Sequence, residues 1–261
     1  MKPATFPYSR HRHPPPAAGT PALECIDATV RYPGADRPAV RSVNLSIPQG
    51  ARVALIGANG AGKSTLLKAA AGLLPLTSGL IHVHGVPPRG CCHRVAYLAQ
   101  RGDLDWRFPM TVRHLVLTGR YVHLGWFRRP NKEDHAIVDR VMDVLQIRDL
   151  AERRIGQLSG GQQQRTLLAR AMAQEADMLL LDEPMNAVDP ATRQIVRQVL
   201  RSLSETGKTI IVATHDMHEI QVQFETIVHL SCGCKEDAGS IEDISVTLQK
   251  PAENRPMALP N

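Results

Sequence analysis

The sequence has no apolar run long enough to cross a membrane. Its longest aliphatic runs, Met178–Leu181 and Ile210–Ala213, have the length of β-strands, whereas a membrane helix needs about 20 apolar residues. The opening segment Met1–Pro7 also lacks the apolar centre of a signal peptide. We therefore expect a soluble protein that stays in the compartment where it is made, the cytoplasm.

Cysteine is scarce, with five residues in the chain. An odd count in an intracellular chain favours reduced thiols over a disulfide framework. Near the C-terminus, His229, Cys232 and Cys234 lie close together in the sequence. These three side chains could bind Zn²⁺ or Mn²⁺, and the alternative is a set of reduced thiols at the surface.

Basic residues exceed acidic ones and give a formal net charge of +6, yet they gather only at Arg128-Arg129 and Arg153-Arg154. This scatter argues against specific nucleic-acid binding, whereas a basic protein beside an anionic membrane surface accounts for the charge. With 43% hydrophobic residues, the chain can bury one sizeable core and a smaller satellite. We expect one large domain with a subdomain.

A glycine-rich loop between a strand and a helix is the strongest motif. Arg52–Ile56 predicts a buried strand, and Leu66–Ala71 predicts a helix whose positive end would face an anion held by the loop. Lys63 would reach the β- and γ-phosphates, and the Ser64 hydroxyl would hold Mg²⁺. A turn that merely caps a helix is the alternative. The expected contacts of a nucleoside triphosphate are Gly57, Ala58, Asn59, Gly60, Ala61, Gly62, Lys63, Ser64 and Thr65.

Two adjacent acids end a second buried strand, which contains Met178–Leu181. Asp182 comes first and suits the Mg²⁺ shell, and Glu183 suits the water that attacks phosphorus. Adjacent acids can also form a solvated turn. In a chain with a phosphate-binding loop, the catalytic interpretation is favoured.

Polar or aromatic side chains follow three further strands. Gln100 comes after Val95–Ala99, and its side-chain carbonyl could enter the Mg²⁺ shell. His215 comes after Thr209–Thr214, at the strand end where α/β sheets place ligands. Tyr32, at the end of the first predicted strand, could stack on adenine, and an ordinary turn aromatic is the alternative.

A second anion site is predicted at the end of a helical insertion. Apolar residues follow a helical period between Arg101 and Gln157. Ser159 then caps a helix that runs toward Ala173, and the glycine pair after it leaves the N-terminal amides bare.

Two other segments have weaker signals. Gly79–Gly85 alternates as a strand, which would put His82 and His84 on one face, but without a third ligand nearby a solvated face is favoured over a metal site. Residues 1 to about 21 hold little that could be buried and are expected to form a disordered tail.

Taken together, these motifs resemble the ATP-binding subunit of an ABC transporter, over about Leu23–Ile244. The resemblance implies an α/β fold with a P-loop NTPase (RecA-like) core, an antiparallel β-subdomain and an inserted α-helical subdomain. The domain would span residues 22–245, with the helical subdomain at about 101–160. A disordered tail would precede it at 1–21, and a C-terminal tail would follow at 246–261.

The resemblance also implies an ATPase that uses ATP and Mg²⁺ as a head-to-tail dimer of two ATP-binding subunits. The catalytic residues would be Lys63, the Q-loop glutamine Gln100, Glu183 and the switch histidine His215. The Mg²⁺ ligands would be Ser64, Gln100 and Asp182. Outside the phosphate-binding loop, the nucleotide would contact Tyr32, the signature residues Ser159, Gly160, Gly161 and Gln162, and the D-loop aspartate Asp189.

A finer resemblance is to importers of manganese, zinc or iron, through Arg101–Pro109, Gly119–Tyr121 and Gly125–Pro130. It implies a separate integral membrane permease, an extracytoplasmic metal-binding protein reached through that permease, and a peripheral position on the cytoplasmic face of the cell (inner) membrane. Two segments depart from the family pattern, Met185–Asp189 and Cys232–Cys234. Neither departure removes a catalytic group.

Other cargoes, such as an iron chelate or another solute, are alternatives within the family. A DNA-maintenance ATPase would carry a long coiled coil between Ser64 and Ser159, and that interval lacks sustained heptads. A translation-associated ABC protein would contain two cassettes in one chain, and this sequence contains one.

Overall fold

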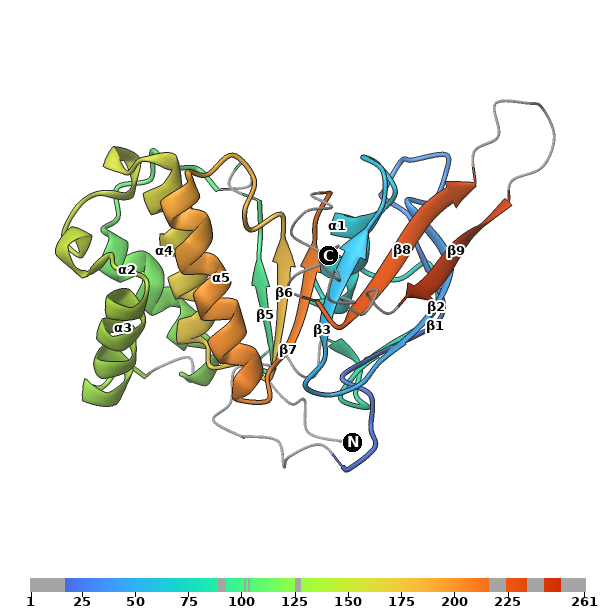
Figure 1. Cartoon of the computed structure of the whole chain (residues 1–261), viewed down its shortest axis with the longest axis horizontal. Helices are drawn as coiled ribbons and strands as arrows, with labels where there is room; N and C mark the ends of the chain where they lie inside the picture. The colour runs from blue at the N-terminus through green and yellow to red at the C-terminus, as the bar shows by residue number, and fades with distance from the viewer. Residues whose placement is uncertain are drawn as a thin grey trace, which may run out of the picture.

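A six-stranded sheet lies at the centre of the protein (Figure 1), in a computed structural model that describes residues 17–88, 93–100, 102, 104–124, 128–215, 224–233 and 242–249. The strand order is β5-β6-β7-β3-β8-β9, and all neighbouring pairs are parallel except β8 with β9. In that order the strands are Val95–Leu98, Met178–Asp182, Thr209–Ala213, Arg52–Ile56, Thr226–Gly233 and Glu242–Gln249.

The inner strands are aliphatic because both faces of the sheet are covered. Every residue of β6 and of β7 is buried, which is typical of parallel strands packed on two sides. In the parallel register, Leu55 of β3 and Asp182 of β6 both lie beside Ala213 of β7. The carboxyl ends of these three strands therefore meet at one edge of the sheet.

A second sheet has three antiparallel strands in the order β2-β1-β4. These strands are Val40–Ile47, Leu23–Val30 and Ser78–Val83. Helix α1 (Lys63–Ala70) packs against this sheet and the central one, because Leu66 and Leu67 share a buried cluster with Leu23 of β1 and Leu55 of β3.

Helices cover the other face of the central sheet (Figure 1). They are α2 (Val112–Leu117), η3 (Thr118–His123), α3 (Lys132–Val144), η4 (Arg148–Leu150), η5 (Ile155–Gln157), α4 (Gly160–Ala173) and α5 (Pro190–Glu205). Apolar residues of α2, α3, α4 and α5 form one cluster with Ala54, Leu98 and Leu179 of the sheet. None of the helices in the described ranges has the length and apolar character that a membrane span requires.

The predicted fold class is confirmed: the structure has a parallel core, an antiparallel β-sheet and a helical layer. Two boundaries differ from the prediction. Helix α4 runs to Ala173 and packs on α2 and α3, so the helical layer continues past 160. Strand β9 ends at Gln249, beyond the predicted limit at 245. Residues 1–16 of the predicted N-terminal tail lie outside the described residues.

The predicted shared face of His82 and His84 is wrong. Strand β4 ends at Val83, and His84 has a positive φ of 48°, which turns the chain out of the strand. The imidazole of His84 is buried, and burial lowers its pKa. His82 stays on the strand, 3.6 Å from Glu24 Oε2.

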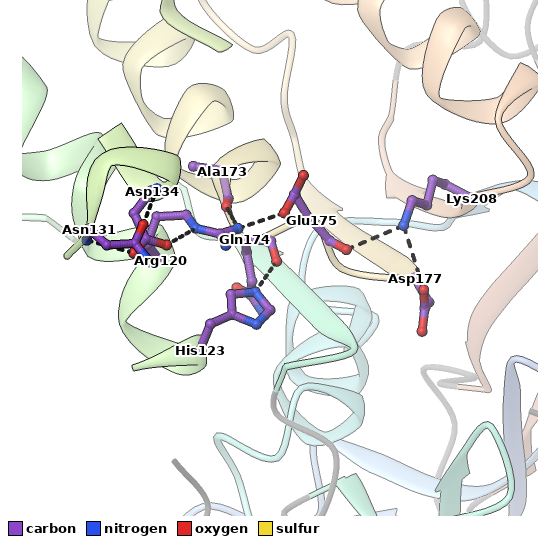
Figure 2. A network of polar contacts seen from close by, with 9 residues as sticks. All are labelled: Arg120, His123, Asn131, Asp134, Ala173, Gln174, Glu175, Asp177 and Lys208. Atoms are coloured by element: carbon purple, nitrogen blue, oxygen red, sulfur yellow. Dashed lines mark hydrogen bonds and ion pairs between the residues drawn. The ribbon is translucent and has the colours of Figure 1, made fainter. Parts of the chain in front are cut away.

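A buried arginine joins the helical layer to the segment that leads into β6 (Figure 2). Nε of Arg120 donates to Asp134 Oδ1 at 3.0 Å, and a terminal nitrogen donates to the Ala173 carbonyl at 2.7 Å and to Glu175 Oε2 at 2.9 Å. The side chains of Arg120 and Asp134 are each 6% exposed. Burial raises the pKa of Asp134, but hydrogen bonds from the Asn131 N–H and from Arg120 outweigh it, so the pKa lies below its ordinary value.

Further hydrogen bonds connect the end of α4 to the central sheet. The side-chain amide of Gln174 donates to the backbone carbonyl of Val95, the first residue of β5, at 2.7 Å. The backbone carbonyl of Gln174 lies 2.6 Å from His123 Nε2. Lys208, which precedes β7, donates to the carbonyl of Glu175 at 3.3 Å. The C-terminal end of α4 is therefore tied to η3, α3 and the amino ends of the strands.

Replacing Arg120 by alanine tests how much the buried pair of Arg120 and Asp134 contributes to stability. The change leaves the Asp134 carboxylate buried without its partner, so we expect a loss of about 3–5 kcal/mol in the free energy of unfolding, measured by urea denaturation. The control is Arg201→Ala, which removes an exposed ion pair with Glu205 one helical turn away and should cost no more than about 0.5 kcal/mol. Equal losses in the two variants would contradict a structural role for the buried pair.

Candidate active site

The loop between β3 and α1 has a backbone that only glycine can form at two positions. Gly57 and Gly62 have φ of 153° and 91°. A Cβ on Gly57 would lie 2.3 Å from the Leu230 carbonyl oxygen, and one on Gly62 would lie 2.4 Å from the Ala39 carbonyl oxygen. The loop is thus pressed between β8 and the segment before β2, while Ala58–Gly60 remain exposed.

The loop and helix α1 together can bind an anion. No side chain among the described residues caps α1, and its first turn has no acidic residue. The first backbone N–H groups and the positive end of the helix are therefore available to phosphate oxygens. The buried Lys63 keeps its ammonium at the same loop, since Nζ donates to the carbonyls of Gly57 and Ala58 at 2.7 and 2.9 Å.

Asp182 has the surroundings of a Mg²⁺ ligand. It ends β6 and is 2% exposed. Its Oδ2 accepts from the Tyr97 hydroxyl at 3.3 Å, but its buried Oδ1 has no hydrogen-bond partner among the described residues. Burial raises the pKa of Asp182, and the hydroxyls of Ser64 and Tyr97 oppose that rise. A buried carboxylate oxygen without a partner, beside a serine hydroxyl, suits a hard cation that prefers oxygen ligands.

Glu183 is turned toward β7 by a left-handed backbone conformation. Its φ is 49°, and its N–H donates to the carbonyl of Ala213 at 3.0 Å. One carboxylate oxygen, Oε1, lies 3.2 Å from His215 Nδ1, and the other, Oε2, accepts from the side-chain amide of Asn186 at 2.8 Å. The predicted pair Glu183 and His215 is therefore brought into direct contact.

A cavity of about 60 Å³ adjoins this pair. A volume of that size can hold a water molecule where polar groups line it. Its walls are formed by Glu183, Pro184, Met185, Asn186, Arg193, Val212, Thr214 and His215.

Two further predicted residues lie at the same edge of the sheet. Gln100 is exposed and follows β5. Because Leu98 of β5 pairs with Leu181 of β6, the chain at Gln100 leaves the sheet beside the two acids. The hydroxyl of Tyr32 lies 3.2 Å from Thr65 Oγ1 at the start of α1, and Tyr32 is 39% exposed. An exposed aromatic ring beside the start of a helix that can bind an anion could stack on a base.

The predicted signature residues lie elsewhere, at the start of α4 in the helical layer (Figure 1). Ser159 and Gln162 form a capping box, and Gly160 and Gly161 open the helix. A Cβ on Gly161 would lie 2.5 Å from Asp189 Oδ2, so α4 and the cap of α5 are in close contact. Hydrogen bonds from the backbone N–H and the hydroxyl of Thr192 lower the pKa of Asp189.

Sequence reasoning missed three groups at the site. Tyr97, Asn186 and Arg193 have no motif of their own, and only the unusual segment Met185–Asp189 marked the position of one of them. The predicted metal cluster at His229, Cys232 and Cys234 lies partly outside the described residues, since Cys234 and the side chain of Cys232 are not described.

Comparisons of the sequence with a family model and with known proteins point to the same family. Residues 40–186 match the family model described as ABC transporter. The zinc transport system ATP-binding protein TroB of Treponema pallidum is 43% identical over 210 residues, which are 80% of this chain and 78% of that protein. The manganese transport system ATP-binding protein MntB of Bacillus subtilis is 39% identical over 230 residues, or 86% of this chain and 91% of that protein.

A solved structure extends the likeness to the fold. It is an ATP-binding cassette described as a dimer in a post-hydrolysis state bound to ADP and Pi. It matches with a TM-score of 0.73 and 25% identity, covering 87% of this chain and 98% of that chain.

Proposed function

The chain belongs to the ABC transporter family, and from this premise we propose a role for each part of its site. It is an ATP-binding subunit that hydrolyses ATP. The proposal is that hydrolysis, in a head-to-tail dimer, drives import of a divalent metal ion through a separate membrane permease. One observation carries the catalytic part: the loop after β3, the acids at the end of β6 and the histidine after β7 lie at one edge of three adjacent strands.

Nucleotide binding is assigned to the loop 57–62 and to the start of α1. Its backbone N–H groups would donate to the phosphate oxygens, and Lys63 would exchange its carbonyl partners for the β- and γ-phosphates. Tyr32 would stack on the adenine. Asp182, Ser64 and Gln100 would hold Mg²⁺, whose charge offsets that of the phosphates.

Hydrolysis is assigned to Glu183 and His215. The carboxylate of Glu183 would accept a hydrogen bond from the attacking water, orient it and take up its proton as the oxygen approaches phosphorus. His215, 3.2 Å from Oε1, would hold that oxygen toward the reacting centre. The water would be polarised only while the carboxylate is ionised and correctly turned.

The separation of α1 and α4 supports a composite site. The start of α4, with Ser159, Gly160 and Gly161, lies in the helical layer and not at the edge that carries Lys63. In a head-to-tail dimer, each α4 would donate to the γ-phosphate bound by the partner, with Gln162 and Asp189 beside it. The dimeric cassette in the comparison supports this assembly.

The metal cargo is proposed from the relatives, which are named for zinc and for manganese transport. Iron is a third candidate by the same resemblance, and an iron chelate or another solute is the alternative. The permease would dock near the segment after Gln100, where Phe108 and Tyr121 are 58% and 50% exposed. The subunit would then lie peripherally on the cytoplasmic face of the membrane and serve an extracytoplasmic metal-binding protein through the permease.

Lys63→Ala and Glu183→Gln should both abolish turnover but fail at different steps. Loss of the lysine removes ground-state neutralisation of phosphate, so ATP affinity should fall in equilibrium binding. The glutamine variant keeps the shape of the site, so ATP should still bind while the hydrolysis rate drops by roughly 10²–10⁴. Near-normal hydrolysis by Glu183→Gln would move the catalytic role to another group such as His215.

Dimer formation should depend on ATP. Light scattering of the Glu183→Gln variant should give the mass of one chain without nucleotide and of two chains with ATP and Mg²⁺, because each γ-phosphate needs donors from both subunits. The Lys63→Ala variant is the matched control and should stay monomeric. The same mass with and without ATP and Mg²⁺ would argue against a composite site.

The cargo can be identified in proteoliposomes that contain this subunit and the permease that co-purifies with it. We expect ATP-dependent uptake of Mn²⁺, Zn²⁺ or Fe²⁺ that disappears with Glu183→Gln. Uptake of an iron chelate without free metal ions would support the alternative cargo. Absence of any co-purifying membrane protein would count against a transport function.

A further inference from the structure

Asn186 contacts Glu183 twice. Its backbone N–H donates to the Glu183 carbonyl at 3.2 Å, and its side-chain Nδ2 donates to Glu183 Oε2 at 2.8 Å. Since His215 Nδ1 lies 3.2 Å from Oε1, each oxygen of the carboxylate has its own partner. The carboxylate is therefore held from two sides, by the chain segment that follows it and by the end of β7.

The chain around Asn186 is well anchored. Residues 183–186 form a turn closed by the backbone hydrogen bond, and Pro184 at its second position restricts φ. Met185 is buried, and Ala187 adopts a left-handed conformation with φ of 52°. Asn186 itself is exposed, so burial does not account for its side-chain position.

A glutamate side chain has several rotatable bonds, and holding it in one rotamer costs conformational entropy. A hydrogen bond from an amide to an ionised carboxylate is stronger than one between neutral groups, so Asn186 can offset that cost. The bond occupies Oε2 and leaves Oε1 for His215 and for water. The asparagine amide reaches Oε2, whereas a serine hydroxyl is shorter and an ionised aspartate has no hydrogen to donate.

We propose that Asn186 is a positioning residue for the catalytic carboxylate. It fixes Oε2 of Glu183 so that Oε1 is presented to the attacking water in a single orientation. The inference rests on the proposed catalytic role of Glu183, whose Oε2 accepts the hydrogen bond from Asn186.

The first test is a double-mutant cycle on ATP hydrolysis with Asn186→Ala and Glu183→Gln. We expect Asn186→Ala to lower kcat by roughly 10- to 100-fold, as for loss of a hydrogen bond to a charged group, with KM for ATP changed less than about twofold. In the Glu183→Gln background the same change should alter the residual rate by less than about twofold, because no carboxylate is left to orient. A merely structural defect would lower the rate by the same factor in both backgrounds.

Asn186→Asp separates the hydrogen bond from the turn. Aspartate favours turns as asparagine does and has nearly the same shape, but its carboxylate would repel that of Glu183. We expect kcat to fall at least as far as in Asn186→Ala, with the midpoint of thermal unfolding close to that of the unmodified protein. Near-normal turnover by Asn186→Asp would show that the turn alone matters and would overturn the proposal.

Asn44→Ala is the matched control. Asn44 Nδ2 donates to the Asp27 carboxylate at the same distance, 2.8 Å, but in the antiparallel sheet. Its replacement should leave kcat unchanged. If Glu183→Gln is inactive while both Asn186 variants are normal, or if Asn186→Ala loses the same factor in both backgrounds, only the present inference fails. If Glu183→Gln itself remains active, the proposed catalytic role of Glu183 fails, and the positioning role fails with it.

Discussion

The parallel register of β3, β7 and β6 is the constraint on which the rest of the site depends. Neighbouring strands lie about 4.8 Å apart, so β6 is about 10 Å from β3, with β7 between them. Because Leu55, Ala213 and Asp182 stand side by side in this register, the loop after β3, His215 and the two acids lie at the same level of the sheet. A slip of one residue in β6 would send Asp182 to the opposite face and separate it from Ser64.

Local backbone conformations then aim the side chains that the register brings together. A regular continuation of β6 would send Glu183 to the face opposite Asp182. Its left-handed φ of 49° ends that regular course, and its Oε1 lies 3.2 Å from Nδ1 of His215, which follows β7. A left-handed residue other than glycine costs on the order of 1–3 kcal/mol, and the surrounding packing of Met185 and Val188 holds it in place. The packing of Met185 and Val188 thus offsets the cost of the left-handed conformation and keeps the Glu183 carboxylate in its orientation.

Sequence patterns predicted the features that depend on local chemistry. Continuous aliphatic runs identified β3, β6 and β7, and Ser159 marked the start of α4, since strands buried on both faces and helix caps have strong residue preferences. Contacts between distant segments had no such signal. Arg120 lies in the segment Gly119–Tyr121 that supports the finer resemblance, but no local pattern predicts its burial, because its partner Glu175 is 55 positions away in the sequence. The hydrogen bond from Asn186 to Glu183 depends on the left-handed conformation of Glu183, which the residue type glutamate does not predict.

Helix α4 has both a feature that depends on local chemistry, its cap at Ser159, and contacts between distant segments at each of its ends. Its last carbonyl, that of Ala173, accepts from Arg120, and Gly119 approaches the helix so closely that a Cβ would lie 2.2 Å from the Arg170 carbonyl oxygen. Its first turn touches the carboxylate of Asp189 at Gly161. Because Asp189 ends the segment that begins at Glu183, a displacement of the start of α4 must either open the contact at Asp189 or be passed into that segment. Helix α4 is therefore fixed at its C-terminal end by Arg120 and lies at its start against the segment that follows Glu183, so the two ends are constrained by different parts of the chain.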